Sequence, residues 1–120
     1  DEVGMVGKPE REQKAADRIF GLLPSDQEKH FRALWDEFEE RKSPEARFAA
    51  ALDRLQPVLL NVNTDGHAWK HHGIRHNQVL DRNRHMAEGS EAIWEYARAE
   101  IQKAVDRGDL LPSAPETPPE

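Results

Sequence analysis

The chain has 120 residues, of which 37% are hydrophobic and 33% charged, with a formal net charge of -6 and no cysteine. This length suits one domain with a modest core, and the composition favours amphipathic helices over a disordered chain. The negative net charge disfavours binding to a nucleic acid polymer. No apolar stretch is long enough to cross a membrane, and the lack of cysteine excludes disulfides and thiolate chemistry.

Hydrophobic residues recur at helical spacing, and no valine-rich alternating run indicates a strand, so the predicted fold class is all-α. The sequence begins at Asp1 without an initiator methionine or a secretory leader. We therefore expect a cytoplasmic protein of which this chain is a part. The expected organisation is a helical domain over residues 1–111 and a disordered proline-rich tail over residues 112–120.

Three helices are expected in the first half of the chain. The first runs from about Pro9 to Leu23, and the second follows Pro24 and ends near Lys42. The third opens at Ser43, which is placed to cap it and is followed by a proline in the first helical position. Its predicted buried face consists of four large residues at spacings of four, three and four: Phe48, Leu52, Leu55 and Leu59.

The second half is expected to begin with a loop over residues 63–73, rich in Asn, Gly and His. A short helix over residues 75–86 should follow. Ser90 is placed to cap a last helix that ends at Gly108. The predicted buried stripe of that helix is Ile93, Trp94, Ala97, Ile101, Ala104 and Val105.

Asp53 is the unusual residue of the third helix, because it lies at the border of the predicted buried face. A carboxylate there without a partner would cost several kcal/mol of desolvation or be protonated, so it needs a cation, a hydrogen-bond donor or a metal. Pro57 has no N–H to donate to the Asp53 carbonyl, so the helix should bend and could turn the aspartate inward. From these residues, two interpretations stay open: an ion pair with Arg47, Arg54 or a lysine, and a metal ligand.

The stretch "LLPSDQEKHFRALWDEFEERKSPEARFAAALDRLQPVLL" resembles HD-domain phosphohydrolases of the 5'-deoxynucleotidase-like subgroup. The similarity is good over residues 9–62 and looser over "EGSEAIWEYARAEIQKAVDRG". Its first two motifs are a Leu-Pro turn, here Leu23-Pro24, and an acidic Leu-Trp helix, here Leu34 to Glu37. The other two are a "SPEARF" helix start, here Ser43 to Phe48, and a Leu-Asp pair, here Leu52-Asp53. The resemblance implies the C-terminal portion of an HD-domain-like helical bundle.

In that family a divalent metal is held by an early histidine, a later His-Asp pair and a final aspartate, and the resemblance places the final aspartate at Asp53. The sequence has no histidine before His30 and no His-Asp dipeptide, so the other ligands are expected upstream of Asp1. A single carboxylate binds a divalent ion weakly, so this chain alone should be inactive.

The implied reaction of the intact protein is hydrolysis of a phosphate monoester, such as a deoxynucleoside 5'-monophosphate, with Mn, Co or Mg bound. The resemblance assigns no catalytic acid or base to these residues. The first two helices would pack on absent ones, so we expect exposed apolar surface and a homodimer. The alternative is a helical protein-interaction domain without metal.

Two other features suggest binding sites. His67 with His71 and His72 with His76 have the four-residue spacing of zinc-binding pairs, although a histidine-rich surface loop explains them as well. Residues 67–85 are locally basic, which is compatible with a phosphorylated ligand or a solvated patch. The tryptophans are interpreted as core or interface anchors.

Overall fold

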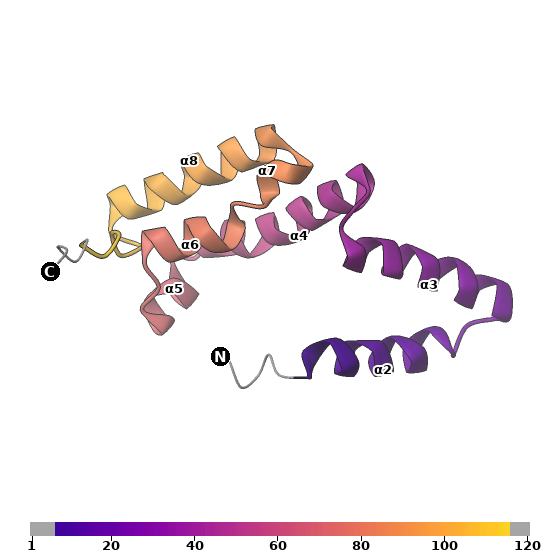
Figure 1. Ribbon diagram of the computed structural model, residues 1–120. Coiled ribbons are helices and arrows are strands. Elements are labelled where there is room, and N and C mark those ends of the chain that lie inside the picture. Colours follow the sequence, from indigo (N-terminus) through magenta and orange to yellow (C-terminus); the bar gives the residue numbers. More distant parts are fainter. Residues whose placement is uncertain (1–6, 116–120) are drawn as a thin grey trace, which may run out of the picture. The chain divides into compact units, whose positions relative to one another are not determined.

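The computed structural model describes residues 7–115, and within them the regular secondary structure is helical (Figure 1). One isolated bridge pairs Arg75 with Leu111, and no strand occurs in that range. The prediction of an all-α fold is therefore confirmed. The helices are α2 (Lys8–Phe20), α3 (Ser25–Glu40), α4 (Pro44–Val62), α5 (His67–His72), α6 (His76–Asn83), α7 (Met86–Gly89) and α8 (Glu91–Arg107).

The chain forms two compact units, one ending at Glu40 and the other beginning at Arg41. In the first unit, α2 and α3 are joined by a short turn and contact each other through Phe20 and Trp35, whose ring centroids lie 6.4 Å apart. The guanidinium of Arg32 lies 5.4 Å from the Trp35 ring and binds Asp17 at 2.6 Å. These contacts hold the two helices together with little buried apolar surface.

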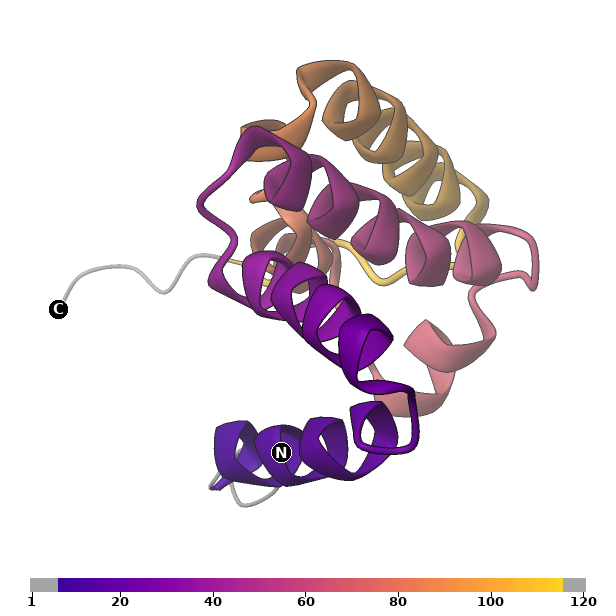
Figure 2. The same cartoon turned by 90° about the vertical axis from the view of Figure 1, so that its right-hand side faces the viewer.

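The second unit is built around α4, with α7 and α8 packed against it, as Figures 1 and 2 show. Its core lies where these helices meet and also takes side chains from α5, α6 and the segment after α8. The buried members of this core are Ala51, Val58, Trp69, Val79, Met86, Ala97, Ile101, Ala104 and Leu110. The predicted stripe of the last helix is confirmed, because Ile93, Trp94 and Val105 pack on this core beside its three buried members.

The predicted buried face of α4 is wrong for two of its four residues. Phe48 and Leu52 are 46% and 47% exposed, whereas Leu55 packs on the core. The residues that α4 buries are mostly small: Ala46, Ala50, Ala51, Val58 and Asn61. Small side chains let α7 approach the α4 backbone closely, which a face of large residues would prevent.

The predicted helix caps are confirmed. The Ser43 hydroxyl accepts a hydrogen bond from the Ala46 N–H at 3.1 Å, and the Ser90 hydroxyl accepts one from the Ile93 N–H at 3.2 Å. Gly108 ends α8 in the left-handed conformation, with φ 83°. Each cap satisfies backbone groups that the helix itself leaves unpaired.

The loop predicted over residues 63–73 contains a helix instead. α5 lies between Gly66 and Gly73, whose φ values of 71° and 61° fit a residue without Cβ. The Asn61 side-chain oxygen accepts hydrogen bonds from the N–H groups of Ala68 and Trp69, at 3.1 and 3.2 Å. Two N–H groups in the first turn of α5 are therefore satisfied by a side chain from α4, seven and eight residues earlier in the sequence.

The first four residues of the predicted tail, 112–115, are exposed and have no regular secondary structure. The rest of the tail, residues 116–120, and the opening residues 1–6 are not among the residues that the structure describes. The backbone just before the tail is tied to α6, since the His76 N–H donates to the Leu111 carbonyl at 2.8 Å. No helix in the described part of the chain is both long and apolar enough to cross a membrane.

Candidate functional site

Asp53 lies on the outward side of α4. Its side chain is exposed and makes no hydrogen bond or ion pair with any residue in the range 7–115. Within this unit the carboxylate does not point into the bundle, so the expectation of an inward turn is wrong. The expected ion pair with a nearby arginine or lysine is also absent from the described residues. Water solvates the charge, and no desolvation cost arises.

Large apolar side chains are exposed on the same helix. Leu60 is 65% exposed, and Phe48 and Leu52 are about half exposed. Ala49 and Gln56 lie one turn before and one turn after Asp53, and neither is charged. The carboxylate is therefore the one acidic group on the part of α4 between Ala49 and Leu60.

Both arginines that the sequence offered as partners for Asp53 are engaged elsewhere. The Nε of Arg54 donates to the side-chain oxygen of Asn83 at 3.1 Å. The Nε of Arg47 donates to the Arg41 carbonyl at 3.3 Å. The carboxylate is consequently left available to an external cation.

α4 continues through Pro57, which lies inside the helix. The proline removes the N–H that would otherwise bind the Asp53 carbonyl. The Asn61 side chain donates to the Pro57 carbonyl at 3.0 Å, which adds a bond one turn further on. The backbone turn that carries Asp53 thus lacks one of its helical hydrogen bonds.

The histidine pairs do not form a metal site with other described residues. His71 and His72 contact each other edge to face, with ring centroids 4.8 Å apart. In residues 7–115 no group of three or more His, Asp or Glu side chains is arranged to hold a metal ion. The basic segment is partly neutralised, since Lys70 binds Asp109 at 3.0 Å and Arg84 binds Asp81 at 3.2 Å.

His85, another of the histidines in the segment that the sequence offers as a possible metal site, is half-buried near α4. Burial is the main cause that lowers its pKa, and the positive charges of Arg41 and Arg54 lower it further. Glu88 acts in the opposite direction, and it also lies 3.9 Å from Arg41. The neutral form of His85 is therefore favoured in the folded chain.

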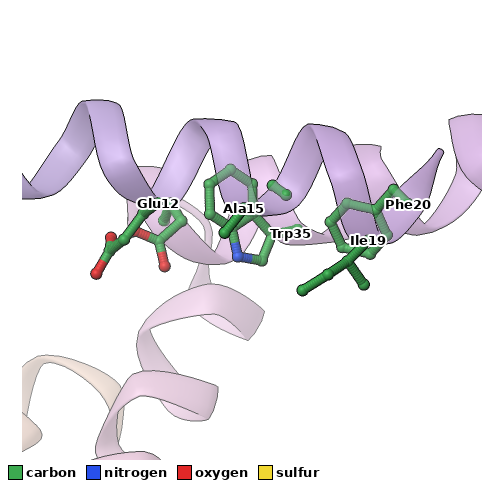
Figure 3. Close-up of a pocket in the computed structure, with 7 residues that line it drawn as sticks. Glu12, Ala15, Ile19, Phe20 and Trp35 are labelled. Atoms are coloured by element: carbon green, nitrogen blue, oxygen red, sulfur yellow. The ribbon is translucent and has the colours of Figure 1, made fainter.

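The first unit contains an open cavity of about 390 Å³ between α2 and α3. Figure 3 shows Ala15, Ile19 and Phe20 of α2 along this cavity together with Trp35 of α3. Two carboxylates, Glu12 and Glu39, complete a lining that is otherwise apolar. The cavity offers apolar contact and no positive charge, so it does not suit a phosphate group.

The HD domain family matches residues 1–94. The chain belongs to this family. A solved structure from Magnetospirillum magnetotacticum MS-1, described as a predicted metal-dependent phosphohydrolase, is 50% identical with a TM-score of 0.82, covering 88% of this chain and 54% of that one. The bovine (Bos taurus) 5'-deoxynucleotidase HDDC2 is 37% identical over 59 residues, which make up 49% of this chain and 29% of that protein.

The zebrafish (Danio rerio) 5'-deoxynucleotidase HDDC2 is 30% identical over 112 residues, which cover 76% of this chain and 55% of that protein. The chain thus spans between about a third and about half of the relatives that it matches. The resemblance predicted from the "SPEARF" and Leu-Asp motifs is confirmed at the level of the family.

The residues of this HD-family chain fit a divalent metal in part. The Asp53 carboxylate is exposed and unpaired, and carboxylate oxygens are the ligands that Mg²⁺ and Mn²⁺ prefer. One carboxylate holds such an ion weakly, so further ligands are required. Asp53 fits one position in a metal site and cannot form the site alone.

Proposed function

We propose that this chain is part of an HD-type metal-dependent phosphohydrolase that acts on phosphate monoesters, specifically deoxynucleoside 5'-monophosphates. The similarity to the predicted metal-dependent phosphohydrolase of Magnetospirillum magnetotacticum supports the reaction class most strongly, since it joins 50% identity to a shared fold over 88% of the chain. The relatives called 5'-deoxynucleotidase support the substrate class.

Asp53 would contribute one carboxylate ligand, and the histidine and His-Asp ligands would come from residues outside this chain. When bound, Mn, Co or Mg would polarise the phosphoryl group and lower the pKa of a water molecule. Asp53 itself would hold its position and carry negative charge, without transferring a proton. Its free carboxylate and the engagement of Arg47 and Arg54 with other groups support this role.

The test is a chimera in which the part of the Magnetospirillum magnetotacticum protein not covered by this chain is fused ahead of Asp1. Affinity for Mn²⁺ is measured by following free Mn²⁺ with electron paramagnetic resonance, in the parent and in Asp53→Ala. We expect a loss of at least about tenfold in the variant, since a ligand is removed. Asp106→Ala, which removes another exposed helical aspartate, is the matched control and should bind like the parent.

A chimera that binds no Mn²⁺, or one in which Asp53→Ala binds as tightly as the parent, would overturn this assignment. Equal affinity would favour the alternative of a helical interaction domain. Hydrolysis of deoxynucleoside 5'-monophosphates over the corresponding ribonucleotides then tests the substrate class in the same chimera.

We further propose that the intact protein is a cytoplasmic homodimer, since its substrate would be met in the cytoplasm. Support for the dimer comes from large exposed apolar side chains in both units, among them Leu22 at 82% and Leu60 at 65% exposure. Sedimentation of the chimera at increasing concentration should show a dimer. A monomer at every concentration would contradict this part of the proposal.

A further inference from the structure

Asn83 is one of two buried polar side chains in the described part of the chain, and only 3% of it is exposed. Both ends of its amide are used. The nitrogen donates to the Val79 carbonyl at 2.8 Å, and the oxygen accepts from Arg54 Nε at 3.1 Å. Because the nitrogen is fixed to the backbone of α6, the oxygen is aimed at α4 and cannot rotate away without losing a buried hydrogen bond.

The bond from Asn83 reaches α4 at the residue next to Asp53. The backbone is weakened at this point, because Pro57 cannot donate to the Asp53 carbonyl. Arg54 links this turn to the buried Asn83 of α6. This link therefore contributes more to the position of the turn than it would in a helix that keeps all its backbone hydrogen bonds.

The same bond also controls a charge. A guanidinium that Asn83 does not hold is free to move, and a positive charge near Asp53 would compete with a metal ion for it. With Arg54 held by Asn83, the Asp53 carboxylate is unpaired. The position of the Asp53 turn and the location of the Arg54 charge thus both depend on the hydrogen bond between Arg54 and Asn83.

We propose that Asn83 is a positioning residue for Asp53, acting through Arg54 to orient this turn of α4 and to keep the guanidinium away from the carboxylate. The inference rests on the proposed function, in which Asp53 binds a metal. Groups that hydrogen-bond a metal ligand directly typically change metal affinity about 10- to 100-fold when they are removed, and Asn83, which acts through one more residue, should lie at the low end of that range.

The experiment uses the same chimera and the same Mn²⁺ titration. Asn83→Ala and Arg54→Met each remove the link, and each should weaken Mn²⁺ binding about tenfold. The double variant should lose no more than about twofold beyond either single variant, because both break one interaction. Arg54→Lys keeps a donor and should recover part of the affinity.

Asn61→Ala is the matched control. Asn61 is the other buried asparagine, also with both amide ends bonded, and it lies on α4 two turns beyond Asp53. Its loss should lower the melting temperature as Asn83→Ala does, yet leave the Mn²⁺ affinity within about twofold of the parent. Arg54→Met alters a half-buried side chain and tests the link without a buried cavity.

The outcomes separate this inference from the proposed function. If Asp53→Ala loses affinity while Asn83→Ala and Arg54→Met bind like the parent, Asn83 has a structural role alone and the proposed function stands. If Asn61→Ala weakens Mn²⁺ binding as much as Asn83→Ala, general destabilisation explains the loss and the inference falls. If Asp53→Ala binds like the parent, both fall.

Discussion

Replacing Gly89 with alanine tests the close approach of α7 to α4 in the second unit. Gly89 ends α7, and a Cβ placed there would lie 2.1 Å from the Arg47 carbonyl oxygen, 2.5 Å from the Arg47 carbonyl carbon and 2.9 Å from the Phe48 Cα. All three atoms belong to the backbone of α4, so no side chain can rotate to make room. α7 must move away from α4, which loosens the packing of the buried Met86.

The expected cost is about 3 kcal/mol, the upper end of the range for overpacked cores. A domain of this size has a free energy of unfolding of about 5–15 kcal/mol, so the loss is a large fraction of the whole.

Two other glycines separate the effect of space from that of backbone conformation. At Gly73, φ is 61° and no atom lies within 4 Å of the added Cβ, so Gly73→Ala should cost only about 1–2 kcal/mol from strain.

At Gly66 both effects act together, since φ is 71° and the Cβ would lie 2.1 Å from the Asp109 carbonyl oxygen. Gly66→Ala should therefore be the most destabilising of the three. Urea unfolding of the full chain, followed by circular dichroism, gives the three values. A Gly89→Ala variant within about 0.5 kcal/mol of the parent would show that α7 is not packed directly on α4, and would refute the reasoning.

Three further outcomes follow from local contacts. Ser43→Ala removes the cap that accepts from Ala46 and should cost about 1 kcal/mol in urea unfolding. Asp53→Ala in the isolated chain should change the free energy of unfolding by less than about 0.5 kcal/mol, because the side chain is exposed and unpaired, and a larger loss would reveal a hidden partner. Burial and Arg41 lower the pKa of His85, so the unfolded chain binds the proton more tightly than the folded one. The contribution of His85 to the free energy of unfolding should therefore be fully present above the ordinary pKa of 6.5 and should decline as the pH falls below it. His85→Gln should reduce this decline between about pH 8 and about pH 5, and an unchanged pH dependence would contradict the assignment.

Helix starts could be predicted from the sequence because they depend on a few adjacent residues. Ser43 and Ser90 each accept a hydrogen bond from an N–H three residues on, and this bond needs no distant partner. α5 was missed for the opposite reason. Its first N–H groups are satisfied by Asn61 of α4, and this contact between separate elements leaves no local pattern in the residues of the short helix.

The buried face of α4 could not be predicted from hydrophobic spacing, because the helix is apolar on more than one side. Spacing selected Phe48 and Leu52, whereas the structure buries Ala46, Ala50 and Ala51. The choice between the two faces is made by Gly89, whose missing Cβ lets α7 lie directly on the backbone at Arg47 and Phe48. Such a close approach favours the small residues, and it becomes visible only when both helices are placed.

The hydrogen bond between Arg54 and Asn83 also joins two separate helices, so it too becomes visible only when both helices are placed. An asparagine on the apolar side of a predicted short helix was the available signal, and its partner 29 residues earlier in the chain could not be identified from spacing. The sequence predicts a partner for Asp53 because it places this carboxylate at the border of a buried face. In the structure Phe48 and Leu52 of that face are exposed, and Asp53 is exposed without a partner among the described residues. The sequence offers Arg54 as a possible partner, and the structure gives that arginine to Asn83.

The exposure of Asp53 removes the desolvation cost that the sequence predicts for it. A carboxylate costs nothing while water surrounds it, but any segment that covers the exposed Phe48 and Leu52 would also remove water near Asp53. Covering the apolar surface without a cation would bury an unpaired carboxylate, and that cost would oppose association. Under the proposed function a divalent ion offsets that cost, so metal binding and burial of the α4 surface should strengthen each other.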